Sequence, residues 1–218
     1  MSAVEIRTGQ RITGVRRSKR DATLVVVMLD GARAGEVDAA EAERLGIVRG
    51  AALDASVAAG LHAAIALCAA RRDAVRLARA RSRTRAELVQ RLTERGHSAA
   101  VAVAAAEWLA ASGAIDERTV AEVAAIGMAE RKVSRRLARD RLVQRGIDEG
   151  QAAGAIERAF GDRDDLDLAI EAARRRAASV RGLAPDTARR RLSGFLARRG
   201  YDEETCHEAV RVVLGGVE

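Results

Sequence analysis

Leu92-Thr93-Glu94-Arg95-Gly96 is a short stretch that returns twice along the chain, as Leu142 to Gly146 and as Leu196 to Gly200. All three copies read Leu-x-x-Arg-Gly, and their glycines are 50 and 54 residues apart. Internal periods of this size are typical of stacked helical units, each too small to bury its own apolar face. The sequence therefore predicts a repeat protein.

Helix start and stop signals surround each copy. Thr84 followed by Glu87 is a capping box, Ser134 is the expected cap in the second copy, and Pro185 opens the third. Each glycine should end its helix, because glycine adopts the left-handed conformation at low cost. The 48 alanines and the single proline also favour helix. One more helix is expected on either side, at about 70–79, 116–130 and 164–181 before the caps and at 98–112, 148–160 and 202–214 after the glycines.

The first 50 or so residues have a different pattern. The β-branched run 24–29 is bounded by Asp30-Gly31, which predicts a buried strand ending in a turn. Residues 12–15 are its expected hairpin partner, and 38–45 form a short helix. The predicted organisation is a β-containing N-terminal element (1–52), a connecting helix (53–69) weakened by Gly60, and three-helix repeats at 70–112, 113–161 and 162–218.

The residues carry little sign of catalytic chemistry. Four aromatic residues are too few for proteins that stack bases on exposed rings. His62, His97 and His207 lack companions at metal-ligand spacing, and His97 is expected at the surface. Neither an enzymatic activity, a metal nor a cofactor is therefore predicted.

Two loops could be mistaken for binding motifs. The run from Gly31 to Gly35 lacks the Lys-Ser/Thr of a phosphate loop. The acidic run from Gly161 to Asp165 is expected to be a capped loop before a helix rather than a metal site. Cys68 and Cys206 are expected to be reduced, which together with the absence of a signal peptide or membrane span predicts a cytoplasmic protein.

Positive charge is concentrated in three windows. Residues 71–95, 130–145 and 174–199 carry +6, +5 and +8. The whole chain carries +7, so the remainder carries −12. Arginine stems covering the core would explain any single residue, but the recurrence favours an interaction surface for a polyanion. Stacked repeats would align the windows into one basic stripe.

Several motifs resemble the bacterial RecX regulatory proteins. Arg81 to Leu88, followed by Leu92 and Gly96, resembles the family signature R-x-R-[ST]-x-x-E-L-x-x-x-L-x-x-x-G. Gly113-Ala-Ile-Asp-Glu117 resembles its G-x-[LI]-D-[DE] segment, and the two later Leu-x-x-Arg-Gly copies resemble its second and third repeats. The resemblance covers about residues 70–214, in family order.

The resemblance implies a fold and a function. The fold would be mainly α, with three tandem three-helix repeats forming an elongated, curved molecule. The protein would be a non-enzymatic modulator, expected to be monomeric, that binds the RecA filament on single-stranded DNA. It would most often inhibit RecA in DNA recombination, repair and the SOS response.

Two departures from the family pattern affect contacts more than fold. Val120 replaces an aromatic residue, and Leu137 stands where the first repeat has Glu87, so the second capping box is lost.

The arginines in or beside the middle helix of each repeat are the candidate docking residues. A sequence-independent nucleic-acid-binding protein that acts without RecA, through phosphate contacts to single- or double-stranded DNA, is the alternative. The candidates are Arg81, Arg83, Arg85, Arg91 and Arg95; Arg135, Arg136, Arg139, Arg141 and Arg145; and Arg189, Arg190, Arg191, Arg198 and Arg199.

Overall fold

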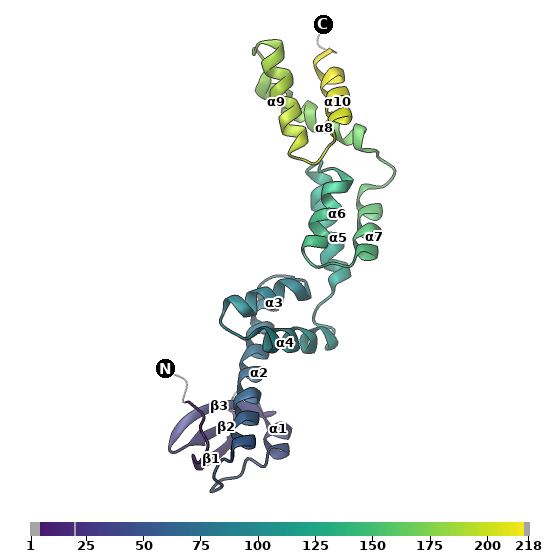
Figure 1. Ribbon diagram of the computed structural model, residues 1–218. Coiled ribbons are helices and arrows are strands. Elements are labelled where there is room, and N and C mark those ends of the chain that lie inside the picture. Colours follow the sequence, from purple (N-terminus) through teal and green to yellow (C-terminus); the bar gives the residue numbers. More distant parts are fainter. Residues whose placement is uncertain (1–4, 20, 216–218) are drawn as a thin grey trace. The chain divides into compact units, whose positions relative to one another are not determined.

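The computed structural model describes residues 5–19 and 21–215 and divides the chain into two compact units, Met1–Ile115 (unit 1) and Asp116–Glu218 (unit 2) (Figure 1). It is mostly helical, with a small sheet near the N-terminus, which confirms the predicted fold class. In unit 1 the elements are β1 (Ile12–Arg17), β2 (Leu24–Leu29), β3 (Ala32–Asp38), α1 (Ala39–Arg44), α2 (Ala55–Ala80), α3 (Arg85–Glu94) and α4 (Ala99–Ala111). In unit 2 they are α5 (Glu117–Glu130), α6 (Arg135–Gln144), α7 (Glu149–Phe160), α8 (Asp165–Ala177), a 3-10 turn (Ala178–Val180), α9 (Pro185–Ala197) and α10 (Glu203–Gly215).

The sheet is antiparallel, with β2 between β1 and β3. Alternate residues of β2, namely Val25, Val27 and Leu29, are buried, as expected for a strand with one face on the core. Asp30 and Gly31 both have positive φ, 48° and 83°, and join β2 to β3 in a two-residue turn of the kind that suits a hairpin.

The strand β3 is missing from the sequence prediction, which has only a two-stranded hairpin. Its sequence, Ala-Arg-Ala-Gly-Glu-Val-Asp, carries a single large apolar residue, Val37, which is fully buried. Pairing with β2 therefore stabilises this edge strand more than its own apolar pattern does. The Asp-Gly pair was the available signal, because it predicts a second strand directly after it.

The helix α2 corrects a second prediction. The connecting helix and the first helix of the first repeat were expected to be separate, but residues 55–80 form one unbroken helix. Two glycines allow it to pack closely. A Cβ at Gly60 would lie 2.6 Å from Leu45 Cδ2, and a Cβ at Gly35 of β3 would lie 2.5 Å from Ile65 Cγ2. Gly60 thus serves the packing of α1 on α2 and does not end the helix.

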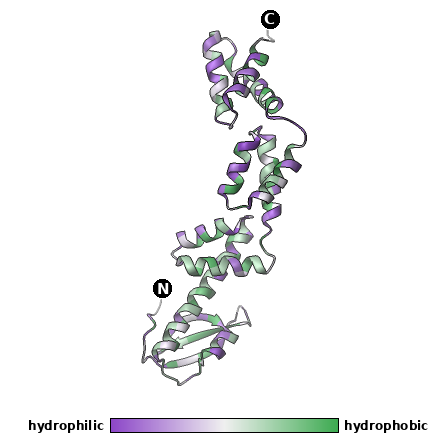
Figure 2. Cartoon of the chain, turned by 45° about the vertical axis from the view of Figure 1, so that its right-hand side comes forward, coloured by the Kyte–Doolittle hydropathy of each residue, from purple (hydrophilic) through white to green (hydrophobic). Residues whose placement is uncertain are grey.

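The helices from α2 to α10 form three triplets. In α2–α3–α4, α5–α6–α7 and α8–α9–α10 the first helix packs against the third, and the second also lies mainly on the third. The helix expected over 164–181 ends earlier, at Ala177, and continues as the 3-10 turn. Apolar residues, green in Figure 2, are concentrated in β2 and α4, whereas α6 and α9 are richer in polar residues.

The Leu-x-x-Arg-Gly motif is a helix C-terminus. In the first copy Gly96, at φ 92°, donates its N–H to the carbonyl of Thr93 at 2.9 Å, and His97 donates to the carbonyl of Leu92 at 3.2 Å. This pair of bonds satisfies the last free carbonyls of a helix. The other two copies repeat both bonds, and the motif leucines, Leu92, Leu142 and Leu196, are fully buried.

The predicted caps begin the middle helices of the first two triplets. Thr84 accepts from the N–H of Glu87 at 3.1 Å, and the Glu87 carboxylate accepts in return from the N–H of Thr84 at 3.1 Å, so the capping box is present. Ser134 caps α6 alone, accepting from the N–H of Leu137 at 3.2 Å. Pro185 is the first residue of α9, as predicted.

Candidate partner-binding surface

The first arginine set surrounds α3 in unit 1. Arg83 is half-buried and donates to the carbonyls of Leu77 and Arg81, so it holds the loop between α2 and α3. Arg85, the first residue of α3, is exposed. The remaining three members are exposed and face acids, in the pairs Arg91–Glu94 (2.7 Å), Arg81–Glu87 (3.8 Å) and Arg95–Asp73 (3.9 Å).

The second set surrounds α6, and Arg135 is its most constrained member. The Arg135 guanidinium donates to the carbonyls of Gly161 and Arg163 and lies 5.6 Å from the centre of the Phe160 ring. It also pairs with Glu157 at 3.1 Å. Arg135 therefore fastens the start of α6 to the loop between α7 and α8.

The other members of the second set are more open. Arg136 is exposed and donates to the carbonyl of Gly200 at 3.2 Å. Arg139 and Arg141 are exposed, and no ion pair or hydrogen bond engages them within the described part of the chain. Arg145 is half-buried. The exposed arginine heads of α6 therefore project from its solvent side.

The third set surrounds α9. Arg199 is half-buried, lies 4.5 Å from the centre of the Phe195 ring and donates to the carbonyl of Arg131. Burial lowers the pKa of Arg199 below its ordinary value. Arg189 pairs with Asp186 at 2.9 Å. The remaining three, which are exposed and have no ion-pair or hydrogen-bond partner among residues 5–19 and 21–215, are Arg190, Arg191 and Arg198.

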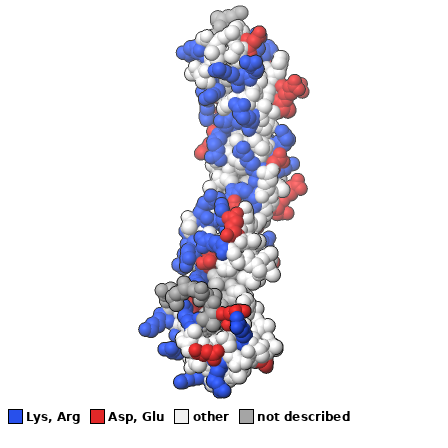
Figure 3. All heavy atoms as spheres, turned by 60° about the vertical axis from the view of Figure 1, so that its left-hand side comes forward, with Lys and Arg blue, Asp and Glu red and all other residues white. Residues whose placement is uncertain are grey.

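The second and third sets are neighbours within unit 2. Ser134 at the start of α6 donates its N–H to the carbonyl of Arg199 at the end of α9, at 2.9 Å. The Arg136 contact to Gly200 spans the same junction. Figure 3 shows Lys and Arg side chains spread over the face of unit 2 turned to the viewer, with acids mainly along its right-hand margin. The arginine sets around α9 and α6 therefore meet at this junction.

Five of the candidate docking arginines, all in unit 2, are exposed and donate to no described residue, and we call them the open arginines: Arg139, Arg141, Arg190, Arg191 and Arg198. By contrast, Arg83, Arg135 and Arg199 each donate to at least one backbone carbonyl of this chain. Only free guanidinium donors can pair with a phosphate or carboxylate of another molecule without breaking internal bonds.

Other cations in the arginine-rich windows serve the fold. Lys132 is buried, has φ 55°, and places its Nζ 2.5 Å from Glu171. Its carbonyl accepts from the Tyr201 hydroxyl at 2.8 Å. Arg175 donates to the carbonyl of Glu130 at 3.2 Å. These residues join the second triplet to the third.

The histidines and acids lie where they have structural partners. His97 was expected at the surface, but its side chain is only 14% exposed, and its Nε2 lies 3.2 Å from Asp73 Oδ2. It is partly covered because the residue after the motif glycine packs back onto its helix. In the 161–165 loop Asp164 caps α8 and Asp165 accepts from the N–H of Arg135 at 3.0 Å. Among the described residues no three His, Cys, Asp or Glu side chains are grouped as metal ligands would be.

Both cysteines are free thiols. Cys206 is buried and Cys68 half-buried, and burial raises the pKa of each thiol above its ordinary value. No described helix is both long enough and apolar enough to cross a bilayer.

The fold and surface define a class: helical-repeat proteins with a small antiparallel sheet and arginine-rich middle helices. The family model described as "RecX, third three-helix domain" matches residues 162–210. Regulatory protein RecX of Chlorobaculum tepidum is 33% identical over 143 residues, which is 65% of this chain and 86% of that protein. Regulatory protein RecX of Mycobacterium avium is 37% identical over 151 residues, 66% of this chain and 84% of that protein. The chain belongs to the RecX family.

Two solved structures have the same fold. "Crystal structure of regulatory protein RecX" aligns with a TM-score of 0.68 at 18% identity, over 95% of this chain and 99% of that one. RecX from Lactobacillus salivarius aligns with a TM-score of 0.52 at 14% identity, over 68% of this chain and 96% of that one. At such identities the likeness concerns the fold alone.

Proposed function

We propose that the chain is a non-enzymatic regulator that acts as a monomer, binds the RecA–DNA filament and inhibits the recombinase, ATPase and co-protease activities of RecA. Membership of a family of regulatory proteins supports a regulatory role. The observation that carries the binding proposal is the set of open arginines on α6 and α9, whose donors no described residue of this chain engages.

The proposed mechanism is electrostatic docking. Arginines aligned along α9 and α6 suit a groove whose walls are acidic protein and whose axis carries phosphates. Such contacts add affinity and speed association without reading base sequence. A docked molecule that bridges neighbouring RecA protomers would limit filament growth, and ATP hydrolysis would fall with filament length.

RecA ATP hydrolysis on single-stranded DNA, with the chain titrated in, tests this proposal. We expect hydrolysis to fall when the chain is present at far less than one molecule per RecA. Inhibition only near saturation of the DNA would indicate competition for phosphate and favour the alternative, a general nucleic-acid-binding protein. Unchanged hydrolysis at every ratio would contradict the inhibitory role.

Charge-reversal variants locate the surface. Arg139→Glu, Arg141→Glu and Arg190→Glu together should weaken filament binding by at least about tenfold, because three free cations are lost. The matched control reverses Arg16, Arg17 and Arg49, which are exposed in unit 1 and make no described ion pair or hydrogen bond. Equal losses in both triple variants would indicate net charge rather than a defined surface. Arg135 is left intact because its reversal would break bonds to the backbone.

Binding to bare DNA separates the two functions. A general DNA-binding protein that makes about 6–10 phosphate contacts should lose about 10³–10⁵ in affinity between roughly 50 and 200 mM salt. A filament regulator should bind bare DNA weakly and gain affinity once RecA coats it.

A further inference from the structure

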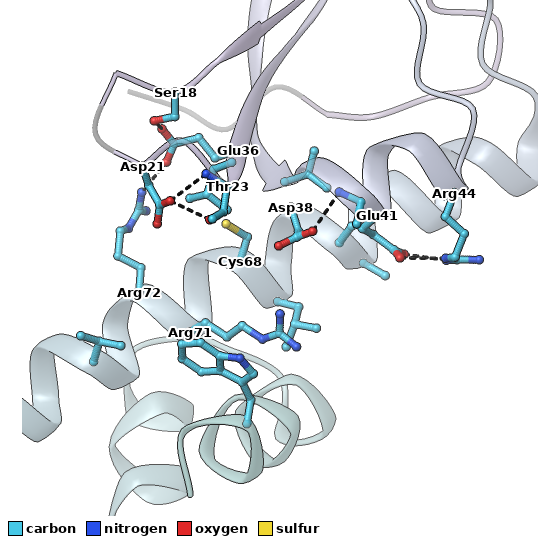
Figure 4. A pocket seen from close by; sticks show the side chains of 18 of the residues that line it. Ser18, Asp21, Thr23, Glu36, Asp38, Glu41, Arg44, Cys68, Arg71 and Arg72 are labelled. Carbon is cyan, nitrogen blue, oxygen red and sulfur yellow. Dashed lines mark hydrogen bonds and ion pairs between the residues drawn. The ribbon is translucent and has the colours of Figure 1, made fainter. Parts of the chain in front are cut away.

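Unit 1 contains a groove that the arginine sets do not use. It has a volume of about 1120 Å³. One stripe of α2, from Gly60 to Arg79, forms its floor, and the sheet and α1 form one wall (Figure 4). Trp108 of α4 also lines it, with its ring centre 5.1 Å from the Arg71 guanidinium. None of the fifteen candidate docking arginines lines it.

The groove is long and its floor is apolar along much of its length. The stripe from residue 60 to residue 79 of a helix extends over about 28 Å. Ala63, Ala64, Leu67 and Val75 line it, and Ala63 is exposed. A floor of small side chains lets a second backbone approach closely. The volume also lies above the roughly 300–1,000 Å³ of ordinary small-molecule sites. The shape therefore fits a chain segment better than a metabolite.

The carboxylates that line the groove are engaged by this chain. Glu41 pairs with Arg44 at 2.6 Å, and Glu36 pairs with Arg72 at 3.1 Å. Figure 4 shows both carboxylates on the sheet and α1 side. The other two acids are held locally, because Asp21 accepts from Thr23 at 2.6 and 2.9 Å and Asp38 accepts from the N–H of Ala40 at 3.0 Å.

Three other arginines that line the groove, all on α2, are less engaged. Arg71 lies 5.1 Å from the centre of the Trp108 ring, and its buried Nε has no hydrogen-bond partner. Arg79 is exposed and makes no ion pair or hydrogen bond with a described residue. Arg76 reaches Asp73 only at 3.4 Å. A planar guanidinium with free donors is the side chain best suited to hold a carboxylate.

We propose that this groove docks a segment of a partner protein that is both acidic and apolar and adopts a helix. Its apolar side chains would cover the floor at Ala63, Ala64 and Leu67. Its carboxylates would pair with Arg71, which lies beside Trp108, and with Arg79. Docking an amphipathic helix in an apolar groove is a common mode of peptide recognition. The groove is a second binding site, independent of the open arginines.

A nucleic-acid strand fits the same groove less well. Its phosphates would pass the carboxylates of Glu36, Asp38 and Glu41 on the sheet side. Base stacking needs free aromatic faces, and the single tryptophan already has Arg71 against its ring.

The sole tryptophan of the chain allows a direct test, because Trp108 lines the groove. The probe is a synthetic helical peptide of about 18 residues, the length of the floor, with leucines spaced three and four apart and glutamates beside them. When the peptide is titrated into the full chain without RecA or DNA, the Trp108 fluorescence emission should change until binding is saturated. The same peptide with glutamine for glutamate should bind at least about tenfold more weakly.

Variants measured by anisotropy of a labelled peptide locate the contact. Arg71→Ala combined with Arg79→Ala should weaken binding by about tenfold, and Ala63→Gln should weaken it by filling the floor. Arg49→Ala, an exposed arginine outside the groove, should bind as the wild type does. Circular dichroism of each variant verifies its folding.

Three results would overturn the docking proposal. They are equal binding of the glutamate and glutamine peptides, a tighter response to an oligothymidine than to the peptide, and self-association of the chain that the groove variants abolish. The last two would assign the groove to nucleic acid or to a second copy of the chain. RecA inhibition is measured separately, so a failure of the docking proposal can be distinguished from a failure of the proposed function.

Discussion

Gly200 shows how a single missing side chain joins two triplets. It has φ 90°, and a Cβ there would lie 2.4 Å from Leu137 Cβ and 2.6 Å from Ser134 Oγ. The motif glycine of the third repeat therefore also forms the contact between α9 and the start of α6. The arginines on those two helices depend on this contact for their alignment.

Gly200→Ala should lower the free energy of unfolding of unit 2 by about 3 kcal/mol or more, because the left-handed backbone and the overlap with Leu137 both oppose a methyl group. Gly182→Ala is the control, since Gly182 also has positive φ, 79°, but has nothing within 4 Å of the added carbon. It should lose only about 1 kcal/mol. Urea unfolding followed by circular dichroism measures both, and equal losses would contradict the close contact.

Tyr201 makes the same junction sensitive to alkaline pH. Burial raises the pKa of Tyr201, whose hydroxyl donates to the Lys132 carbonyl at 2.8 Å. Above about pH 10 the unfolded phenol ionises while the folded phenol stays protonated, so stability present below that pH falls as pH rises. Tyr201→Phe should remove this part of the pH dependence and lower the free energy of unfolding at neutral pH by about 1–2 kcal/mol. Parallel stability curves for both proteins above pH 10 would count against it.

At the scale of elements, the start of α3 depends on the capping box of Thr84 and Glu87. Thr84 is fully buried, so no water replaces its bond to the Glu87 N–H. Thr84→Ala should lower the free energy of unfolding of unit 1 by about 1–2 kcal/mol. Thr84→Ser keeps the capping hydroxyl and should therefore retain most of the wild-type stability. Trp108 fluorescence reports on this unit. Equal losses from both substitutions would assign the effect to the lost methyl group.

Elements with strong local signals were predictable. The caps at Thr84 and Ser134 and the motif glycines have chemistry that depends on a few adjacent residues. The strand β3 was not recognised, because its stability comes from pairing with β2 rather than from its own side chains. The continuity of α2 through Gly60 was also missed, because the packing partner of that glycine, Leu45, lies outside the helix.

The candidate surface was predictable only in outline. The windows of positive charge are visible in the sequence, but the division into committed and open arginines is not. Arg135 and Arg199 are committed because the carbonyls of Gly161 and Arg131 reach them from distant segments. The peptide groove was not foreseen either, since it combines residues of the sheet, α1, α2 and α4.

At the scale of the whole molecule, the apolar interior is divided into separate clusters. One cluster of the described residues lies in unit 2 and runs through all six of its helices. Two others lie in unit 1, one beneath the sheet and one among α2, α3 and α4. No cluster among the described residues therefore includes residues of both units.

A fragment of residues 116–218 should fold alone, with a helical circular dichroism spectrum and a cooperative unfolding transition, because its core draws on no residue of unit 1. The intact chain should then unfold in two steps, one reported by Trp108 in unit 1 and one by Tyr201 in unit 2. A single transition at the same urea concentration for both residues, together with an unfolded fragment, would contradict this independence.

Because α2 is unbroken, its length determines how the sheet is rotated about the helix axis relative to α3 and α4. Each residue of an α-helix advances the chain by about 100° around its axis. One alanine inserted near the middle of α2 would therefore rotate the sheet by more than a quarter turn relative to α3 and α4. The sheet wall of the groove and Trp108 would then no longer face the same way. Seven inserted residues, nearly two whole turns, would restore their direction and lengthen the groove by about 10 Å. The number of residues in α2 therefore fixes the rotation between the sheet at one end of the helix and α3 and α4 at the other.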